Sequence, residues 1–316
     1  MSASVYYETW WIKLMSKPNH FEIIEFNDDN GLICYFPYVL YEKRLFFQTH
    51  TIISMPKFTQ CLGPYINKTT IKWSEYKKIV NYIIDNLPKH SYFDMRFNTV
   101  ITDWLPWYWR GYKQKTLYTF QIKLNNSIEC IFDNFKPRTK NEIRYALKNN
   151  YNVLHFQSID DIYPLIEMTY LKQNLNVPYS KDFLSAIHNE CIKHESINIL
   201  LIEDENGVKQ AGAVLIFNKY STINLITAKN YFYNNRGVTE LLIYESIKFA
   251  SNKSQVFDFE GSMIESINDF YRSFSPELIP YFEITKYNNR FFYFVTMLFS
   301  FTKHLYKNLT NKIVNL

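Results

Sequence analysis

The chain has 316 residues, 47% of them hydrophobic, and a formal net charge of +5. This length is sufficient for two domains with separate cores, and the apolar fraction excludes a disordered chain. The modest positive charge permits an anionic substrate but is not typical of a nucleic-acid-binding protein, so we expect no DNA partner.

Four widely spaced cysteines, with no Cys-x-x-Cys pair, favour free thiols in a reducing compartment. The N-terminus, MSASVYYETWWIKLM, lacks the basic and then apolar layout of a signal peptide. No apolar run reaches the ~20 residues that span a bilayer. These features predict a cytoplasmic protein.

The first part of the chain predicts a sheet with one covering helix. Strands are expected at 21–26, 32–40, 44–49, 92–97 and 117–124, because apolar residues there alternate or are β-branched and aromatic. The signal Asp29-Asn30-Gly31 predicts a hairpin between the first two strands. Ser74 begins a helix that runs to about Leu87 with apolar residues at helical spacing.

Cations gather where the character of the chain changes, near residues 134–150. Lys140, Arg144 and Lys148 are four residues apart, so they share one face of the predicted helix, and Arg138 is near enough to join them. This basic stripe fits a phosphorylated acceptor, such as a nucleotide-sugar, a lipid-linked sugar or the end of a tRNA. The alternative is a solvated basic face.

The second part of the chain repeats the alternation of strands and helices. Helices are expected at 159–173, 181–194 and 239–250, and strands at 197–203, 211–218 and 222–228. His188, Cys191 and His194 are spaced as metal ligands could be, but no fourth ligand follows, so we expect no metal site.

The stretch from Gln255 to Ile284 contains the strongest functional pattern. A strand that begins at Val256 ends in Asp258 and Glu260, Gly261 breaks it, and Ser262 caps a short helix that carries Tyr271. Pro276 and Pro280 are expected to end this helix, and a strand should follow at 281–284. A short helix between two strands predicts a crossover in a mostly parallel sheet, where ligands collect at the strand ends.

The last expected helix, 290–312, is very apolar from Phe291 to Phe301. That run is too short to span a bilayer. It predicts either a core or docking helix or a peripheral membrane contact, so membrane association of a cytoplasmic protein stays an open alternative.

The two halves of the chain share an ordered set of short matches, which predicts a tandem repeat. Asp29-Asn30-Gly31 matches Glu205-Asn206-Gly207, and Tyr92-Phe93-Asp94 matches Val256-Phe257-Asp258. In this repeat Asp94 and Asp258 lie on equivalent strands.

The repeated order of a strand hairpin, a strand, a helix, a strand, a helix and a strand resembles the GNAT acyltransferase fold. Two copies in one chain resemble its FemAB/FemX-like branch. The best local matches are KNEIRYALK at 140–148, Pro178-Tyr179-Ser180, and DFEGS at 258–262 followed by Phe270-Tyr271-Arg272. The resemblance implies an α/β (α+β) protein with two tandem GNAT-like mixed sheet–helix domains. We assign residues 1–125 to the first domain and 126–316 to the second, with a helical front end at 126–194 and a C-terminal helix at 290–316.

The resemblance also implies a donor site. In GNAT enzymes a glycine-containing loop leads into a helix and cradles the pyrophosphate of coenzyme A, because N–H groups and the helix dipole attract anions. The matching loop here is 234–239, and its cofactor-binding candidates are Asn235, Arg236, Gly237, Val238 and Thr239. It keeps one glycine and one arginine. The alternative is an ordinary loop before a helix.

Acyl transfer to an amine needs a base for the amine proton and an acid for the leaving group. By the resemblance, Tyr271 is the acid. Glu260 is the base or orients the substrate, Asp258 assists it, and Tyr179 joins the basic stripe in binding the acceptor. The alternatives are core packing for Tyr271 and hydrogen bonding at the helix start for the two acids.

We therefore expect an N-acyltransferase that uses acyl-CoA, such as acetyl-CoA, and acts on an amine of a sugar or cell-envelope precursor, as in polysaccharide biosynthesis. One alternative is a Fem-type aminoacyltransferase that uses aminoacyl-tRNA. Such enzymes, by the resemblance, carry a long helical hairpin arm, and Pro164 and Pro178 interrupt the segment where it would lie. The other alternative is a GNAT-like binding module without catalysis.

Overall fold

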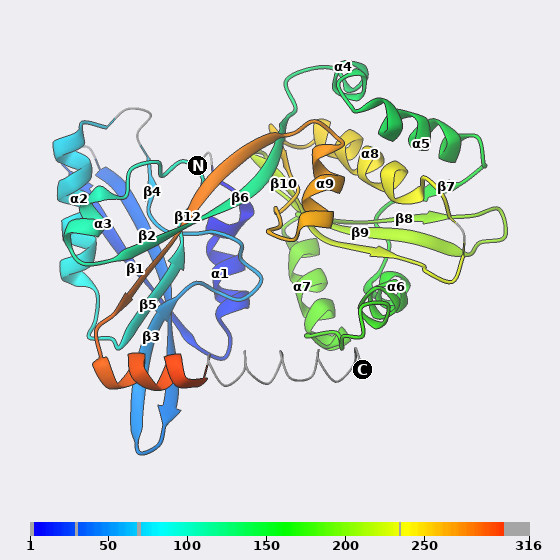
Figure 1. The fold of residues 1–316 in the computed structure, drawn as a ribbon. Coiled ribbons are helices and arrows are strands. Elements are labelled where there is room, and N and C mark those ends of the chain that lie inside the picture. The colour runs from blue at the N-terminus through cyan, green and yellow to red at the C-terminus, as the bar shows by residue number, and fades with distance from the viewer. Residues whose placement is uncertain (1–2, 29–30, 68–70, 234, 300–316) are drawn as a thin grey trace. The chain divides into compact units, whose positions relative to one another are not determined.

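The structure is a computed structural model, and it describes residues 3–28, 31–67, 71–233 and 235–299 (Figure 1). The chain forms two compact units. Unit 1 contains residues 1–14 and 117–280, and unit 2 contains residues 15–116 and 281–316. The predicted boundary between residues 125 and 126 lies near one of three points at which the chain passes between the units. None of the described helices is long and apolar enough to cross a membrane.

Unit 2 is a sheet covered by helices. Its strands lie in the order β1-β2-β3-β5-β12, and β4 pairs with β2. The elements are α1 (Thr9–Ser16, which crosses from unit 1), β1 (His20–Asp28), β2 (Gly31–Leu45), β3 (Gln48–Ser54), β4 (Tyr65–Ile66), α2 (Trp73–Asn86), β5 (Tyr92–Arg96) and α3 (Leu105–Trp109). Ile79, Val80 and Ile83 are fully buried, because they form the apolar face of α2.

Unit 1 has its strands in the order β6-β11-β10-β9-β8-β7. Its elements are η1 (Val5–Tyr7), β6 (Lys113–Lys123), α4 (Ile128–Asp133), α5 (Pro137–Leu147), β7 (Asn152–Leu154), α6 (Ile159–Leu171), α7 (Lys181–Lys193), β8 (Ile197–Glu203), β9 (Lys209–Phe217), β10 (Ser221–Lys229), α8 (Val238–Ser251), β11 (Val256–Asp258), α9 (Glu265–Arg272) and the first residues of β12 (Glu277–Tyr287).

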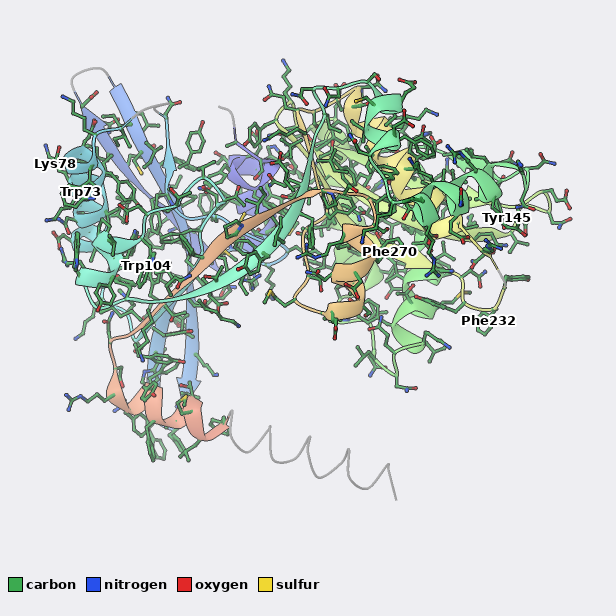
Figure 2. All side chains as sticks on the ribbon, turned by 45° about the horizontal axis from the view of Figure 1, so that its top comes forward. Trp73, Lys78, Trp104, Tyr145, Phe232 and Phe270 are labelled. Atoms are coloured by element: carbon green, nitrogen blue, oxygen red, sulfur yellow. The ribbon has the colours of Figure 1, made fainter. Side chains whose placement is uncertain are left out.

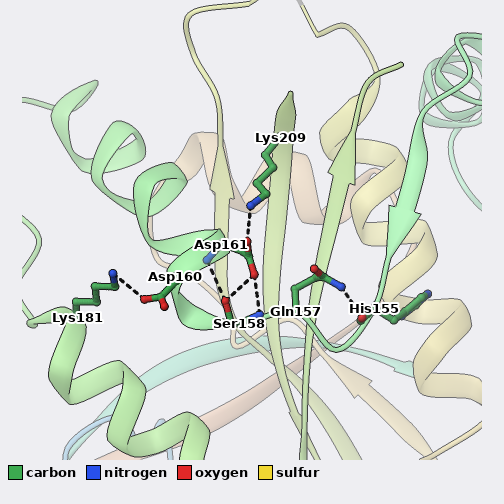
Figure 3. A network of polar contacts seen from close by, with 7 residues as sticks. All are labelled: His155, Gln157, Ser158, Asp160, Asp161, Lys181 and Lys209. Carbon is green, nitrogen blue, oxygen red and sulfur yellow. Dashed lines mark hydrogen bonds and ion pairs between the residues drawn. The ribbon is translucent and has the colours of Figure 1, made fainter. Parts of the chain in front are cut away.

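Helices cover both faces of this sheet. One core lies between α8 and the strands, and α5 packs on the outer side of α8. On the other face, α6 packs on β9 and β10. A capping box of Ser158 and Asp161 begins α6, and Lys209 of β9 pairs with Asp161 (Figure 3). Lys181 of α7 pairs with Asp160, which joins the two helices.

The repeat is visible in the strand order. In unit 2, β1, β2 and β3 pair antiparallel in sequence, and β3 pairs parallel with β5. In unit 1, β8, β9 and β10 pair in the same way, and β10 pairs parallel with β11. Asp94 on β5 and Asp258 on β11 therefore occupy equivalent strands.

The two copies exchange their last strands. Residues 121–123 of β6, which follow the first copy in sequence, pair with β11 in unit 1. Residues 283–287 of β12, which follow the second copy, pair with β5 in unit 2. Phe120 and Ile122 of β6 are buried in the core of unit 1 beside Phe257 and Phe259. This burial explains why residues 117–123 of β6 belong to unit 1.

Four local expectations need correction. The expected strand at 44–49 is instead the end of β2, a two-residue turn at 46–47 and the start of β3. The sheets are not mostly parallel: β3–β5 and β10–β11 run parallel, whereas β1–β2, β2–β3, β8–β9, β9–β10, β6–β11 and β5–β12 run antiparallel. Helix α9 begins at Glu265 rather than Ser262, since Glu260 and Gly261 turn the chain at positive φ and Ser262 caps only a turn. Pro280 lies inside β12 and does not precede it. Residues 290–299 form the expected last helix, and its predicted end lies outside the described residues.

Candidate functional site

The site predicted in the stretch 255–284 is built around the buried carboxyl group of Asp258 at the end of β11. Its Oδ1 accepts hydrogen bonds from the Thr119 hydroxyl at 2.6 Å and from the Glu260 backbone N–H at 2.8 Å. Its Oδ2 accepts from Gln121 Nε2 at 2.8 Å. Burial raises the pKa of Asp258, although these three donors oppose the rise. A carboxylate so enclosed positions its neighbours and has little room for a substrate.

Glu260 sits at a turn that the backbone would not adopt without support. Its φ is 61°, a left-handed conformation that costs energy in a residue with a Cβ. Asp258 holds its backbone N–H, and the Tyr6 hydroxyl donates to its carboxylate Oε1. The next residue, Gly261, has φ 40°, and an added Cβ would lie 2.2 Å from the carbonyl oxygen of Tyr118. The turn is therefore packed tightly against β6.

Tyr271 of α9 lies against the same turn. Its ring packs on Phe259 and Phe120, with centroids 4.9 and 6.1 Å away. Desolvation, and then the charges of Glu260 and Asp258, raise the pKa of Tyr271 to about 12. The Tyr271 hydroxyl therefore stays protonated at neutral pH. Phe259 thus links the Tyr271 ring to the turn that carries Asp258 and Glu260.

Tyr6 belongs to the site and was not predicted from the sequence. It lies 254 residues from Glu260, in the 3-10 helix η1, and is almost fully buried. Asn218 donates to the carbonyl oxygen of Ala3 at 2.8 Å and helps to hold this segment on unit 1. No spacing or motif relates Tyr6 to Glu260, so sequence reasoning had no signal for it.

The parallel strands beside this turn pair over a short distance. Ser221–Ile223 of β10 pair with Val256–Asp258 of β11, and the β10–β9 register then shifts between Asn224 and Ile226. The side chains at 225–227 are only half-buried. Residues 225–227 of β10, next to the Asp258 turn, therefore continue past the part of the strand that β11 pairs with.

The predicted cradle for coenzyme A is packed under α5. Arg236 donates from Nε and Nη2 to Glu142 of α5 at 2.8 and 3.0 Å, and lies 4.7 Å from the ring centroid of Tyr145, which Figure 2 labels. A Cβ on Gly237 would lie 2.3 Å from the carbonyl oxygen of Glu142. Asn235 donates to the Asn230 carbonyl oxygen at 2.9 Å.

The packing of α5 also limits access to the loop at 235–239. Asn235, Gly237 and Val238 are buried, whereas Arg236 is exposed and Thr239 is half-buried. Asn234 lies outside the described residues. Contact with α5 thus covers Gly237 at the start of α8, whereas Thr239 in the first turn is half-buried.

The basic stripe on α5 is partly committed to structure. Lys140 Nζ donates to the carbonyl oxygen of Asp133, and Arg144 lies 5.5 Å from the ring centroid of Phe132. Arg138 lies on the other side, close to Glu142, whose pKa it helps to lower. Arg144 and Lys148 are exposed. Glu142, the one acid between 136 and 148, pairs with Arg236 and lies near Arg138, so it does not offset the charges of Arg144 and Lys148.

Tyr179 precedes α7 and packs against Tyr170, with ring centroids 6.1 Å apart. Burial, and then a hydrogen bond with Tyr170, raise its pKa. These contacts fix the 174–179 segment on α6. The role of Tyr179 in acceptor binding stays a prediction.

Unit 2 contains a hollow of about 360 Å³ at the position equivalent to the cradle. It lies beside the start of α2 and the loop after β5, and Trp73, Tyr76, Val100 and Asp103 are among its lining residues. Tyr76 donates to the carbonyl oxygen of Asp103 at 2.5 Å, which fixes this loop on α2.

Comparisons of the fold identify similar solved structures. FemX matches with a TM-score of 0.68 over 87% of this chain and 90% of its own, at 13% identity. A tandem GNAT protein from the clavulanic acid biosynthesis pathway matches with 0.51 over 88% and 94%, at 6% identity. The C-terminal domain of a putative lysylphosphatidylglycerol synthetase from Agrobacterium fabrum matches with 0.50 over 87% and 90%, at 8% identity.

No protein-family model matches the sequence, and no curated protein matches it either. The structural matches confirm the predicted GNAT-like fold and its likeness to the FemX branch. At these identities they establish the fold alone.

Proposed function

We propose that the protein is an N-acyltransferase that acts on an amine of a cell-envelope or sugar precursor, with the reaction at the end of β11. The observation that carries this proposal is the packing of Tyr271 on Phe259, the residue between Asp258 and Glu260, at a strained turn that Asp258 and Tyr6 hold in place. Backbone strain of this kind persists only where surrounding contacts enforce it, and it is concentrated at functional sites. The FemX-like fold adds weight to acyl transfer.

The residues have distinct roles in this reaction. The amine nitrogen attacks the acyl carbon, a C–N bond forms, and the bond from that carbon to the leaving oxygen or sulfur breaks. Glu260 takes the proton that the amine loses, and Tyr271 gives a proton to the leaving atom. The pKa of about 12 suits Tyr271 to donation, because its hydroxyl is protonated at neutral pH. Tyr6 orients the Glu260 carboxylate, and Asp258 holds the turn.

For the donor we favour aminoacyl-tRNA over acyl-CoA. Glu142 and the backbone of α5 occupy the approach to the helix start that would bind the coenzyme A pyrophosphate. The lack of a long arm does not argue against tRNA. This chain has no such arm in its described residues, and its fold still matches 90% of the FemX chain. In residues 126–194, all of which the structure describes, the longest helices have 13 residues.

Arg144 and Lys148 are suited to contact the phosphate backbone of a tRNA or the phosphates of an acceptor. Contacts of this type act through counterion release, and binding through them weakens as salt rises. Arg144→Ala together with Lys148→Ala should therefore weaken donor or acceptor binding most at low salt and leave kcat at saturation unchanged.

In the experiment, the purified chain is incubated with a labelled mixture of aminoacyl-tRNAs or with labelled acetyl-CoA. The acceptors are UDP-linked and lipid-linked cell-envelope precursors. We expect transfer from aminoacyl-tRNA, and a loss of about 10²-fold or more in kcat for Tyr271→Phe and Glu260→Gln. Tyr244→Phe is the matched control, since that tyrosine is also partly buried against the core of unit 1.

Different outcomes overturn different parts of the proposal. Transfer from acetyl-CoA alone would reject the tRNA donor and keep the chemistry. Full activity of Tyr271→Phe and Glu260→Gln would remove both from the mechanism. Binding of donor and acceptor without any transfer would make the protein a binding module.

A further inference from the structure

The helix at 290–299 has more apolar surface than unit 2 buries. Phe292 and Val295 face inward and pack with Leu45, Ile52 and Tyr92. The outward positions are apolar too: Phe291, Tyr293, Phe294, Met297 and Leu298 are all between 41% and 61% exposed. A helix that is apolar on all sides is normally buried on all sides. These outward side chains therefore present apolar surface that the described residues do not cover.

The hairpin between β2 and β3 extends this surface. Its two-residue tip is Phe46-Phe47, with Leu45 paired to Gln48, and the two rings are 68% and 96% exposed. Phe46 has φ 54°, a conformation for which such turns select asparagine or glycine. Turn geometry therefore does not explain the phenylalanine. Its ring lies 6.1 Å from that of Phe291, so the tip and the helix form one surface. We call the tip and the outer face of the helix the aromatic patch.

The charges around the aromatic patch are mostly positive. Lys43 and Arg44 lie on the hairpin and Arg290 at the start of the helix, with Glu42 as the nearest acid in sequence on β2. From residue 288 to the C-terminus the sequence contains no Asp or Glu. If two copies paired through this patch, their positive charges would repel one another, whereas an anionic surface would neutralise them.

We propose that the aromatic patch docks on a bilayer that contains anionic phospholipid. The rings of Phe46, Phe47 and Phe294 insert among the headgroups, as the apolar side of an interfacial helix does, and Arg44 and Arg290 meet lipid phosphates. The proposed contact is peripheral. This proposal does not depend on the acyl-transfer chemistry.

The test is co-sedimentation of the full chain with vesicles of phosphatidylcholine mixed with phosphatidylglycerol, and with vesicles of phosphatidylcholine alone. We expect binding to the mixed vesicles. The double variant Phe47→Ser with Phe294→Ser should lower the partition coefficient by about 10-fold or more, because it removes two apolar rings that would be buried in the bilayer. Arg44→Gln should lower it about fivefold at low salt. These side chains are exposed, so thermal unfolding should not change.

Phe232→Ser is the matched control, since Phe232 is 74% exposed on a loop of unit 1 and is labelled in Figure 2. It should leave vesicle binding unchanged. A wild-type chain that stays in the supernatant with anionic vesicles would overturn the proposal, as would an equal loss of binding in the control. A third outcome would also overturn it. In this outcome sedimentation equilibrium shows a wild-type dimer, and the double variant is monomeric but binds vesicles as the wild type does.

Discussion

Substitution of Asp258 separates a positioning role from a catalytic one. In Asp258→Asn, Oδ1 can keep the hydrogen bonds from Thr119 and from the Glu260 N–H. The new amide can donate to the Oε1 of Gln121 once that side chain turns over. Every donor and acceptor then stays paired. In Asp258→Ala all three contacts of the carboxylate are lost.

The two variants differ in expected stability. The fully buried Thr119 hydroxyl would be orphaned in Asp258→Ala, whereas Gln121 and Glu260 are partly exposed and can bond water. One buried orphan predicts a loss of about 1–3 kcal/mol in the free energy of unfolding. Asp258→Asn should stay within about 1 kcal/mol of the wild type at pH 7.

The pH dependence gives a second readout. Burial raises the pKa of Asp258 above its unfolded value near 3.9, so the folded state binds the proton more tightly than the unfolded state. The wild type should gain stability from this group as the pH falls through the raised pKa towards 3.9, and Asp258→Asn should not. The stability of the asparagine variant relative to the wild type should therefore decline as the pH falls over that range.

Urea unfolding at several pH values measures the difference in stability and its pH dependence. The value of kcat tests whether Asp258 takes part in proton transfer. If Asp258 positions the turn, Asp258→Asn keeps kcat within about threefold, since no proton transfer is lost. A loss of 10²-fold or more in a variant of normal stability would make Asp258 the general base and refute the positioning role. An Asp258→Ala variant as stable as the wild type would refute the network itself.

Two further predictions concern stability and are measured by urea unfolding. Gly237→Ala should cost about 2–5 kcal/mol, because φ is 74° and the new Cβ meets the carbonyl oxygen of Glu142, whereas Gly207→Ala, at φ 76° in open space, should cost only about 1–2 kcal/mol. Equal costs would mean that α5 does not press on the start of α8. Asp161→Asn should cost about 1–2 kcal/mol at pH 7, since the ion pair with Lys209 is lost and the hydrogen bonds from Ser158 no longer have a charged acceptor. Hydrogen bonds from Lys209 and from the capping serine lower the pKa of Asp161 to about 2, so its contribution is present above the unfolded value near 3.9 and disappears as the pH falls towards 2; a deficit that persists there would contradict this.

The repeat and the core of the candidate site could be predicted from the sequence because both depend on local order. Hydrophobic periodicity identified most strands and helices, and their ordered repetition predicted two copies of one unit. Asp258, Glu260 and Tyr271 lie within 14 consecutive residues, on a strand end and the helix that follows it. A turn at Gly261 is enough to bring them together, so their proximity needs little information from the rest of the chain.

Contacts between distant segments were decided by the tertiary structure. Tyr6 reaches Glu260 across 254 residues. The exchange of β6 and β12 depends on which core buries Phe120 and Ile122, and both cores offer apolar surface of the same kind. The loop at 235–239 has the residues of an anion cradle, yet Glu142 of α5 pairs with Arg236 and closes it. Local periodicity records that a residue is buried or exposed, but it does not record which distant segment covers it, and that is why the sequence alone could not determine these three features.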